Sequence, residues 1–139
     1  MSVNIPSSIL NDSQITVNDL IDGSGWRISP DDFVQILDSV NGKGIIAVNA
    51  SYARYGTSAN PVQTAASYAA SFVRHMNQTL GANIKYWEVG NENYGPWQAG
   101  HIVNGDTING TKYGDIFNVF VDSMKTADPT IKILSLIHI

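Results

Sequence analysis

The sequence has no cysteine and few charged residues. Among its 139 residues there are 8 Lys and Arg and 12 Asp and Glu, with a formal net charge of -4. Without cysteine the chain can form neither disulfides nor thiolate zinc sites. Without a basic surface it lacks the feature that attracts phosphate backbones and anionic membranes. We therefore expect no nucleic-acid partner. Asn104-Gly105-Asp106 is similar to the start of a calcium loop, but the required alternation of ligands fails by Ile108, so we also expect no metal.

The sequence also lacks a long apolar run. No window approaches the roughly 20 apolar residues that a membrane-spanning helix needs. The N-terminus has no basic segment followed by an apolar one, so there is no visible export signal and the compartment stays open. No glycine-rich phosphate loop of the dinucleotide or P-loop type follows any predicted strand. We expect no membrane partner and no cofactor.

Apolar residues make up 43% of the chain, which is enough for the core of one domain. Residues 1–28 show neither helical nor strand periodicity and predict an irregular N-terminal segment. At Ser29 and Pro30 a helix cap followed by proline marks a change of pattern. From there the periodicity predicts helices at 29–40, 60–80 and 112–127, and strands at 44–49, 84–89 and 131–134.

Strands that alternate with helices of this length predict an α/β fold with a parallel sheet, formed by right-handed crossover units. The run at 44–49 is continuously apolar, as in a strand buried on both faces. Two architectures fit: an open doubly wound sheet, or part of an eight-fold barrel. In both, ligands bind at the C-terminal ends of the strands, where Asn49, Asn91 and Glu92 lie.

The stretch around Glu92 carries the chemistry that sugar binding requires. Trp87, Tyr94 and Trp97 flank an Asn-Glu pair directly after a predicted strand. Aromatic faces stack on sugars, carboxamides bind hydroxyls and a carboxyl group can serve as a general acid. These are the requirements of glycoside hydrolysis, apart from a second carboxylate. The alternative is that Glu92 is an exposed loop acid and the aromatic residues are ordinary core.

Residues 87–92, Trp-Glu-Val-Gly-Asn-Glu, resemble the strand-four signature of glycoside hydrolase clan A, whose members are (β/α)8 barrels. The continuation Gly-Pro-Trp-Gln-Ala-Gly-His at 95–101 is similar to glycoside hydrolase family 51, the α-L-arabinofuranosidases and related enzymes. The resemblance implies a partial (β/α)8 TIM barrel over residues 29–133, with about three parallel strands, roughly strands 3 to 5, and their helices.

The same resemblance implies a retaining hydrolase that acts on oligo- or polysaccharides of plant type. Glu92 corresponds to the general acid/base and Asn91 to the residue that binds the substrate's 2-hydroxyl. The nucleophile would come from a seventh strand, which this chain lacks. Residues expected to line the sugar site are Asn49, Trp87, Tyr94, Trp97 and His101. Tyr52, Arg54 and Tyr55 are weaker subsite candidates at the same rim.

The chain is shorter than the roughly 250 residues of a full barrel, so we expect an internal fragment that is itself inactive. An extracellular location is an expectation only for the full-length enzyme. Residues 134–139 match one reading frame of a common sequencing adapter; the alternative is an authentic strand. The competing functional hypothesis is a non-catalytic carbohydrate-binding α/β module.

Overall fold

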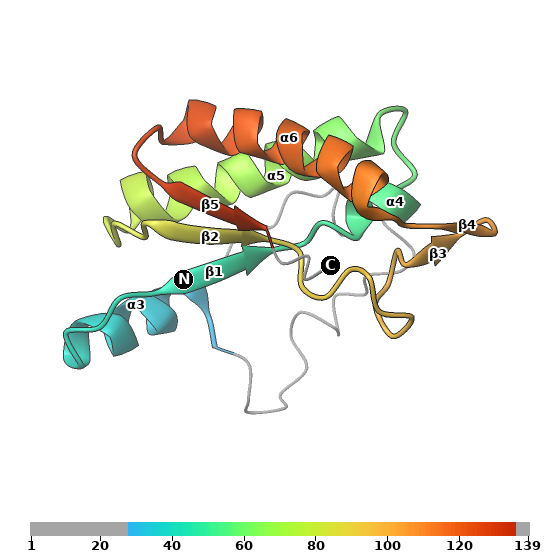
Figure 1. Ribbon diagram of the computed structural model, residues 1–139. Helices are drawn as coiled ribbons and strands as arrows, with labels where there is room; N and C mark the ends of the chain where they lie inside the picture. Colours follow the sequence, from blue (N-terminus) through green and yellow to red (C-terminus); the bar gives the residue numbers. More distant parts are fainter. Residues whose placement is uncertain (1–27, 136–139) are drawn as a thin grey trace.

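The computed structural model describes residues 28–135, which form an α/β structure around a three-stranded parallel sheet (Figure 1). The strands are β1 (Ile45–Val48), β2 (Tyr86–Val89) and β5 (Lys132–Ser135), in the spatial order β1-β2-β5. Both pairings are parallel, and β2 is the central strand. The predicted three-stranded parallel sheet is therefore confirmed, although β2 begins two residues later than expected.

Helix α3 (Pro30–Ser39) begins where the sequence predicts. The Ser29 hydroxyl oxygen accepts a hydrogen bond from the Asp32 backbone N–H at 3.1 Å, and Pro30 occupies the first helical position. This cap satisfies one of the unpaired N–H groups of the first turn. The helix lies beside the N-terminal end of β1 (Figure 1), and Phe33 and Leu37 pack against the core.

Helix α5 (Pro61–Arg74) continues into a π-helical turn, η1 (His75–Thr79), so the single helix expected at 60–80 changes hydrogen-bonding pattern near its end. In that turn the Asn77 side chain binds the backbone just before β2. Its Oδ1 accepts from the Ile84 N–H at 2.7 Å, and its Nδ2 donates to the Ile84 carbonyl at 3.0 Å. The π turn therefore supports the central strand directly.

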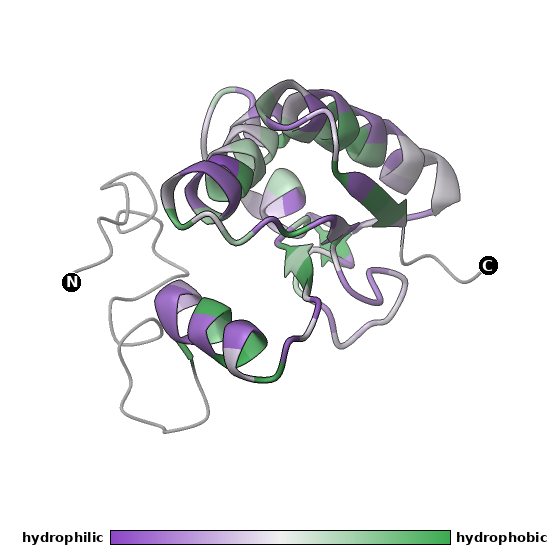
Figure 2. Cartoon of the chain, turned by 90° about the vertical axis from the view of Figure 1, so that its left-hand side faces the viewer, coloured by the Kyte–Doolittle hydropathy of each residue, from purple (hydrophilic) through white to green (hydrophobic). Residues whose placement is uncertain are grey.

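Helix α6 (Gly110–Ala127) begins two residues before the predicted start, and its N-cap is Asn109, whose Oδ1 accepts from the Lys112 N–H at 2.9 Å. Its buried side chains recur every three or four residues, as on the apolar face of an amphipathic helix. They are Tyr113, Ile116, Phe120, Met124 and Ala127. Figure 2 shows α5 and α6 together on one side of the sheet, with α3 set apart from them.

The two faces of the sheet differ in burial. The face toward α5 and α6 carries Val48, Trp87 and Val89, which are buried. The opposite face carries Ile45, which is 55% exposed, and Leu134, which is 39% exposed. On the same face of the central strand, Tyr86 and Glu88 are half-buried. The expectation that residues 44–49 would be buried on both faces is therefore wrong.

Two short elements fall where the sequence predicts loop. Helix α4 (Tyr52–Tyr55) follows β1, and a hairpin of β3 (Ile102–Val103) and β4 (Asp106–Thr107) lies between β2 and α6. The hairpin turns at Asn104 and Gly105, both of which have positive φ, at 51° and 79°. Asn-Gly is the usual sequence of such a tight hairpin turn. The expectation of a continuous loop is therefore wrong for residues 102–107, where this local turn signal forms a hairpin.

The ends of the chain limit two predictions. Residues 1–27 and 136–139 lie outside the described residues, so the irregular segment expected at 1–28 stays a prediction. Strand β5 crosses the boundary proposed at residue 134, because Leu134 pairs with Glu88 and Ser135 with Val89. The origin of residues 134–139 also stays a prediction. Within residues 28–135, no helix combines the length and apolar character needed to cross a bilayer.

Candidate functional site

The predicted polar residues lie at one end of the sheet, as the parallel arrangement requires. Asn49 follows β1, while Asn91 and Glu92 follow β2 after a single glycine. The Gly90 N–H donates to the Val48 carbonyl at 2.9 Å, which joins the two strand ends beyond the last residue of β2. The three side chains are exposed. The C-terminal edge of the sheet is therefore a surface on which polar groups converge.

The chain turns sharply just after β2. Gly90 has φ +78°, and Glu92 has φ +47°, in the left-handed region that residues with a side chain seldom adopt. The Glu92 carbonyl then accepts from the Gly95 N–H at 2.8 Å, which closes a tight turn. This turn leaves the Glu92 side chain at the surface rather than in the core.

The Glu92 carboxylate is held by a tryptophan. The Trp97 indole N–H donates to Glu92 Oε2 at 3.2 Å. The indole ring lies against Gly95, where a Cβ would collide with the ring. Tyr94 meets Trp97 edge to face, with ring centroids 6.3 Å apart, and these rings are 42% and 66% exposed. The site combines one carboxylate with two aromatic rings that face solvent.

Two of the predicted sugar-site residues also support the local fold. The Asn49 Oδ1 accepts from the Tyr52 N–H at 3.3 Å, at the start of α4. His101 is half-buried, and its Nδ1 lies 3.4 Å from the Asn93 carbonyl oxygen. Both residues lie in the segments that follow β1 and β2. Each therefore has a structural role beside any contact with a ligand.

The prediction that Trp87 lines a sugar site is wrong. Its side chain is completely buried, and it packs edge to face on Phe72 of α5, with ring centroids 5.8 Å apart. The indole N–H donates to the Ile84 carbonyl at 3.1 Å. Because side chains alternate along a strand, Trp87 faces the helices. It cannot stack on a ligand at the rim.

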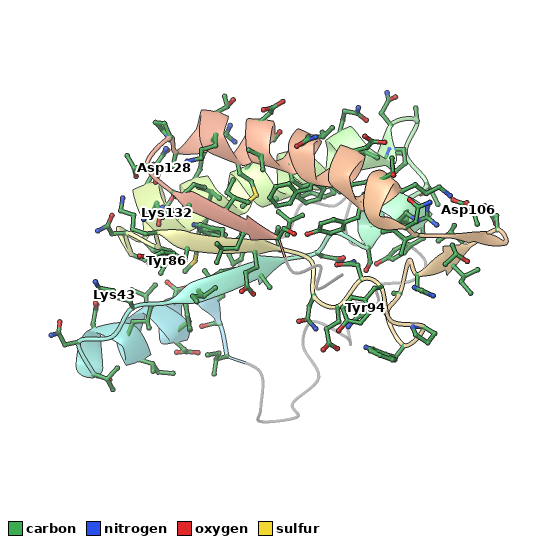
Figure 3. The ribbon with its side chains drawn as sticks, in the orientation of Figure 1. Lys43, Tyr86, Tyr94, Asp106, Asp128 and Lys132 are labelled. Atoms are coloured by element: carbon green, nitrogen blue, oxygen red, sulfur yellow. The ribbon has the colours of Figure 1, made fainter. Side chains whose placement is uncertain are left out.

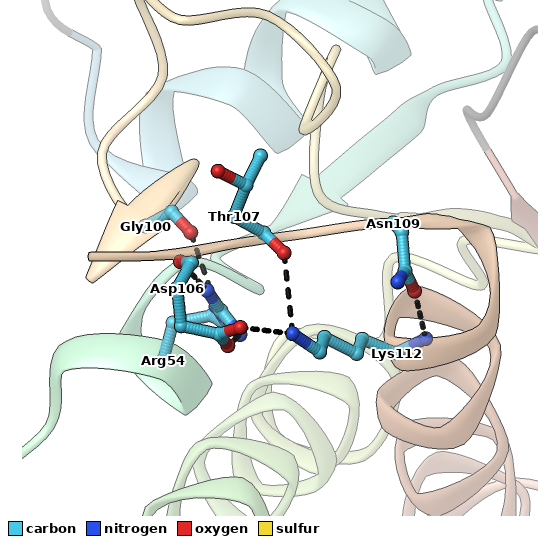
Figure 4. Close-up of polar contacts among 6 residues, drawn as sticks. All are labelled: Arg54, Gly100, Asp106, Thr107, Asn109 and Lys112. Carbon is cyan, nitrogen blue, oxygen red and sulfur yellow. Dashed lines mark hydrogen bonds and ion pairs between the residues drawn. The ribbon is translucent and has the colours of Figure 1, made fainter. Parts of the chain in front are cut away.

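Arg54, one of the subsite candidates, makes structural contacts. Figure 4 shows how it ties the hairpin to the rest of the chain. Its Nε donates to the Gly100 carbonyl at 3.2 Å, and its guanidinium pairs with the Asp106 carboxylate at 2.8 Å. Lys112 of α6 also pairs with that carboxylate. Hydrogen bonds from Lys112 and then Arg54 lower the pKa of Asp106 below its usual value.

The expected absence of a metal stays a prediction, but the partners of Asp106 are known. The Asp106 carboxylate, which lies in a segment that could be mistaken for a calcium loop, is shared between two cations. Within residues 28–135 there is no group of three or more His, Cys, Asp or Glu side chains placed to hold a metal ion.

The other two subsite candidates are tyrosines. Tyr52 is buried, and Tyr55 packs edge to face on it, with ring centroids 5.8 Å apart.

Two residues near the site were not singled out by the sequence. The Tyr113 hydroxyl of α6 donates to the Val89 carbonyl at 2.7 Å and so links α6 to the end of β2. Asn93 is 95% buried beneath the turn, since only 5% of its surface is exposed. Tyr113 could have been found only as part of the apolar stripe of its helix. For Asn93, between exposed Glu92 and Tyr94, the sequence carries no signal.

The opposite end of the sheet has a different character. Figure 3 shows Tyr94 and Asp106 at one end, with Lys43, Tyr86 and Lys132 at the other. A groove of about 300 Å³ lies there between α3 and the segment that leads into β2, and Lys43 and Tyr86 are among its lining residues. None of the predicted site residues lines it. The chemistry predicted from the sequence is therefore confined to the C-terminal edge.

Comparison of the chain with protein-family models, with curated proteins and with solved structures found no match. The function must therefore be argued from the site itself. An exposed carboxylate with a neighbouring carboxamide and two exposed aromatic rings can bind a carbohydrate and exchange a proton with it.

Proposed function

We propose that this chain belongs to the catalytic domain of a retaining glycoside hydrolase that cleaves plant-type polysaccharides in the manner of an α-L-arabinofuranosidase. Glu92 is the general acid/base in this proposal. The observation that carries it is the Glu92 carboxylate at the C-terminal end of the central parallel strand, open to solvent and hydrogen-bonded to an exposed tryptophan. The resemblance of residues 87–101 to family 51 supports the same assignment.

The proposed architecture is a segment of a (β/α)8 barrel. A barrel has helices only on its outer side, and its inner side is filled by side chains from all the strands. An open doubly wound sheet has helices on both faces. Here α5 and α6 cover one face, while the other presents apolar Ile45 and Leu134 to solvent. This one-sided covering favours the barrel, with the remaining strands supplied by the rest of a longer protein.

The proposed reaction has two displacements at the anomeric carbon. A carboxylate from a later strand attacks this carbon while Glu92 donates a proton to the leaving glycosidic oxygen. Glu92 then removes a proton from water, which attacks the same carbon and releases the nucleophile. Because Trp97 donates to Glu92 Oε2, the transferred proton would reside on Oε1. Asn91, next to Glu92, would bind the 2-hydroxyl.

The test uses the full-length protein and aryl α-L-arabinofuranosides. Glu92→Gln is expected to lower kcat for a poor leaving group by about 10²- to 10⁴-fold, since the acid is removed while the shape is kept. Asp115→Asn, on an exposed position of α6, is the control and should keep parental activity. Parental turnover in Glu92→Gln would refute the proposal. The 139-residue chain alone should show no turnover, because one carboxylate cannot serve both steps.

A second candidate is a non-catalytic carbohydrate-binding module, and the exposed rings of Tyr94 and Trp97 favour it. It predicts that this chain alone binds oligosaccharides saturably. Trp97→Ala should abolish that binding, while Glu92→Gln should leave it nearly unchanged. Isothermal titration of the chain with arabino- and xylo-oligosaccharides, together with the activity test above, separates the two candidates.

A further inference from the structure

A buried carboxamide lies directly beneath the proposed acid/base. Asn93 is 5% exposed, although Glu92 before it and Tyr94 after it are exposed. Its Oδ1 is fully buried and has no hydrogen-bond donor within residues 28–135. A buried polar atom without a conventional partner is unusual in a folded protein and calls for a physical reason. The surroundings of this oxygen provide one.

The Asn93 oxygen fits against Gly90. A Cβ at residue 90 would collide with Asn93 Oδ1, lie 2.9 Å from its Cγ and lie 3.1 Å from the Ala50 Cβ. The space that a side chain would need is therefore filled by the carboxamide, and the Cα–H of the glycine faces its oxygen. Such a Cα–H···O contact is a weak hydrogen bond. Only glycine at position 90 is compatible with this arrangement.

Glu92 lies between these two fixed residues. Gly90 has φ +78° and is joined to β1 by its N–H, while Asn93 is anchored by burial. The Glu92 backbone, at φ +47°, is in a conformation that persists only where the surrounding structure enforces it. Gly90 and Asn93 flank this residue in the sequence and pack against each other. The direction of the Glu92 side chain toward Trp97 follows from that backbone.

We propose that Asn93 is a positioning residue for Glu92. By occupying the space beside Gly90, its carboxamide holds the left-handed turn and so places the Glu92 carboxylate against the Trp97 indole. The catalytic consequence rests on the proposed function, whereas the positioning itself does not. The proposal can therefore be tested without any turnover.

The reporter is the indole N–H signal of Trp97 in the 15N-tryptophan-labelled chain, recorded at a concentration where the chain is monomeric. The sequence has three tryptophans, so three such signals are expected, and Trp97→Phe assigns the relevant one. This signal should lie at different positions in the parent chain and in Glu92→Gln, because the substitution replaces the carboxylate that accepts the indole N–H. This difference is the Trp97 shift. The Trp87 signal is the internal reference, because its N–H donates to a core carbonyl.

Asn93→Ala should remove more than half of the Trp97 shift, measured against the Asn93→Ala/Glu92→Gln double variant, while the Trp87 signal stays in place. Asn118→Ala, on an exposed position of α6, is the matched control and should keep the full shift. A full Trp97 shift in a folded Asn93→Ala chain would overturn the proposal. Should that variant not fold, the parent chain decides: three-bond H–N–C–H couplings and Cα shifts must report a positive φ at Glu92, and a negative φ overturns the proposal.

Kinetics of the full-length protein separate this proposal from the proposed function. If Glu92 is the acid/base, Asn93→Ala should lower kcat by about 10- to 100-fold with little change in KM, since a misplaced acid slows the chemistry rather than binding. If Glu92→Gln leaves activity intact, the proposed function fails, yet the indole result still decides the positioning role. If Glu92→Gln is inactive and Asn93→Ala shows a full indole shift, only the positioning role fails.

Discussion

Trp87 and Trp97 show how two stretches of one chain use the same side chain for opposite purposes. Trp87, inside β2, is completely buried, and its indole N–H donates to the backbone carbonyl of Ile84 at 3.1 Å. Trp97, in the loop after β2, is 66% exposed, and its indole N–H donates to the Glu92 carboxylate at 3.2 Å. The strand region contributes to the core, and the loop region carries the candidate site. An aromatic residue close in sequence to the proposed acid/base is therefore not necessarily a ligand contact.

Of the substitutions considered, the loss of Trp87 from β2 should lower the free energy of unfolding most. Trp87→Ala is expected to lower the free energy of unfolding by about 3–5 kcal/mol, because it leaves a cavity between β2 and the helices. Urea unfolding followed by circular dichroism measures this loss. A cost for Trp87→Ala no larger than that for Trp97→Ala would break the comparison.

A smaller effect is expected where α6 supports the end of β2. Tyr113→Phe removes the donor to the buried Val89 carbonyl and should cost about 1–2 kcal/mol. Tyr94→Phe, on an exposed ring, is the matched control and should change stability by less than about 0.5 kcal/mol. Equal effects of the two substitutions in urea unfolding would mean that the hydroxyl contact with Val89 does not stabilise the strand end.

The hairpin should respond to pH through Asp106. Hydrogen bonds from Lys112 and then from Arg54 hold the pKa of Asp106 below the usual 3.8. Since the folded-state pKa is the lower one, the ionised carboxylate stabilises the folded hairpin above pH 3.8, and this contribution is lost as pH falls through the lower value. The Ile108 N–H, bonded to the His101 carbonyl, should report this transition in NMR spectra.

Asp106→Asn should abolish that acid transition. At neutral pH, the NMR signals of the hairpin in this variant should lie part of the way toward the positions that they have in the parent chain at low pH. Asp115→Asn is the control, because Asp115 lies on an exposed position of α6 outside the cluster. Persistence of the transition in Asp106→Asn would assign it to another group and separate the hairpin from the ion pairs drawn in Figure 4.

The loop side of the comparison should affect stability least and ligand binding most. Trp97→Ala is expected to change the free energy of unfolding by less than about 0.5 kcal/mol, since the ring is mostly exposed. The proposed sugar site further predicts that the same substitution abolishes oligosaccharide binding measured by calorimetry. Large destabilisation with intact binding would show that Trp97 is a structural residue like Trp87.

The sequence predicted the positions of helices and strands better than the burial of their side chains. Local signals, such as the Ser29 cap and the apolar stripe of α6, depend on neighbouring residues and proved reliable. Whether a residue is covered depends on elements far away in the chain. Thus the continuous apolar run of β1 predicted burial on both faces, yet Ile45 is 55% exposed.

The sequence correctly predicted that Asn49, Asn91 and Glu92 lie at the C-terminal edge of the sheet, but it did not predict the surroundings of every residue near them. Trp87 is close to Glu92 in the sequence, which led to the prediction that it lines the site. The alternation of side chains along β2 instead points it toward the helices. Asn93 lies between two exposed residues, and its burial results from the turn that Gly90 permits. Such a contact depends on tertiary structure, and no local pattern predicts it.

The most direct test of the central claim uses azide with the full-length Glu92→Ala variant and an aryl glycoside that carries a good leaving group. Such a substrate forms the glycosyl-enzyme without an acid, and water then needs the missing base, whereas azide does not. The expected result is a rate that rises with azide and a glycosyl azide of retained configuration, identified by NMR. Parental hydrolysis without azide, or an azide product of inverted configuration, would contradict the assignment of Glu92 as acid/base of a retaining hydrolase.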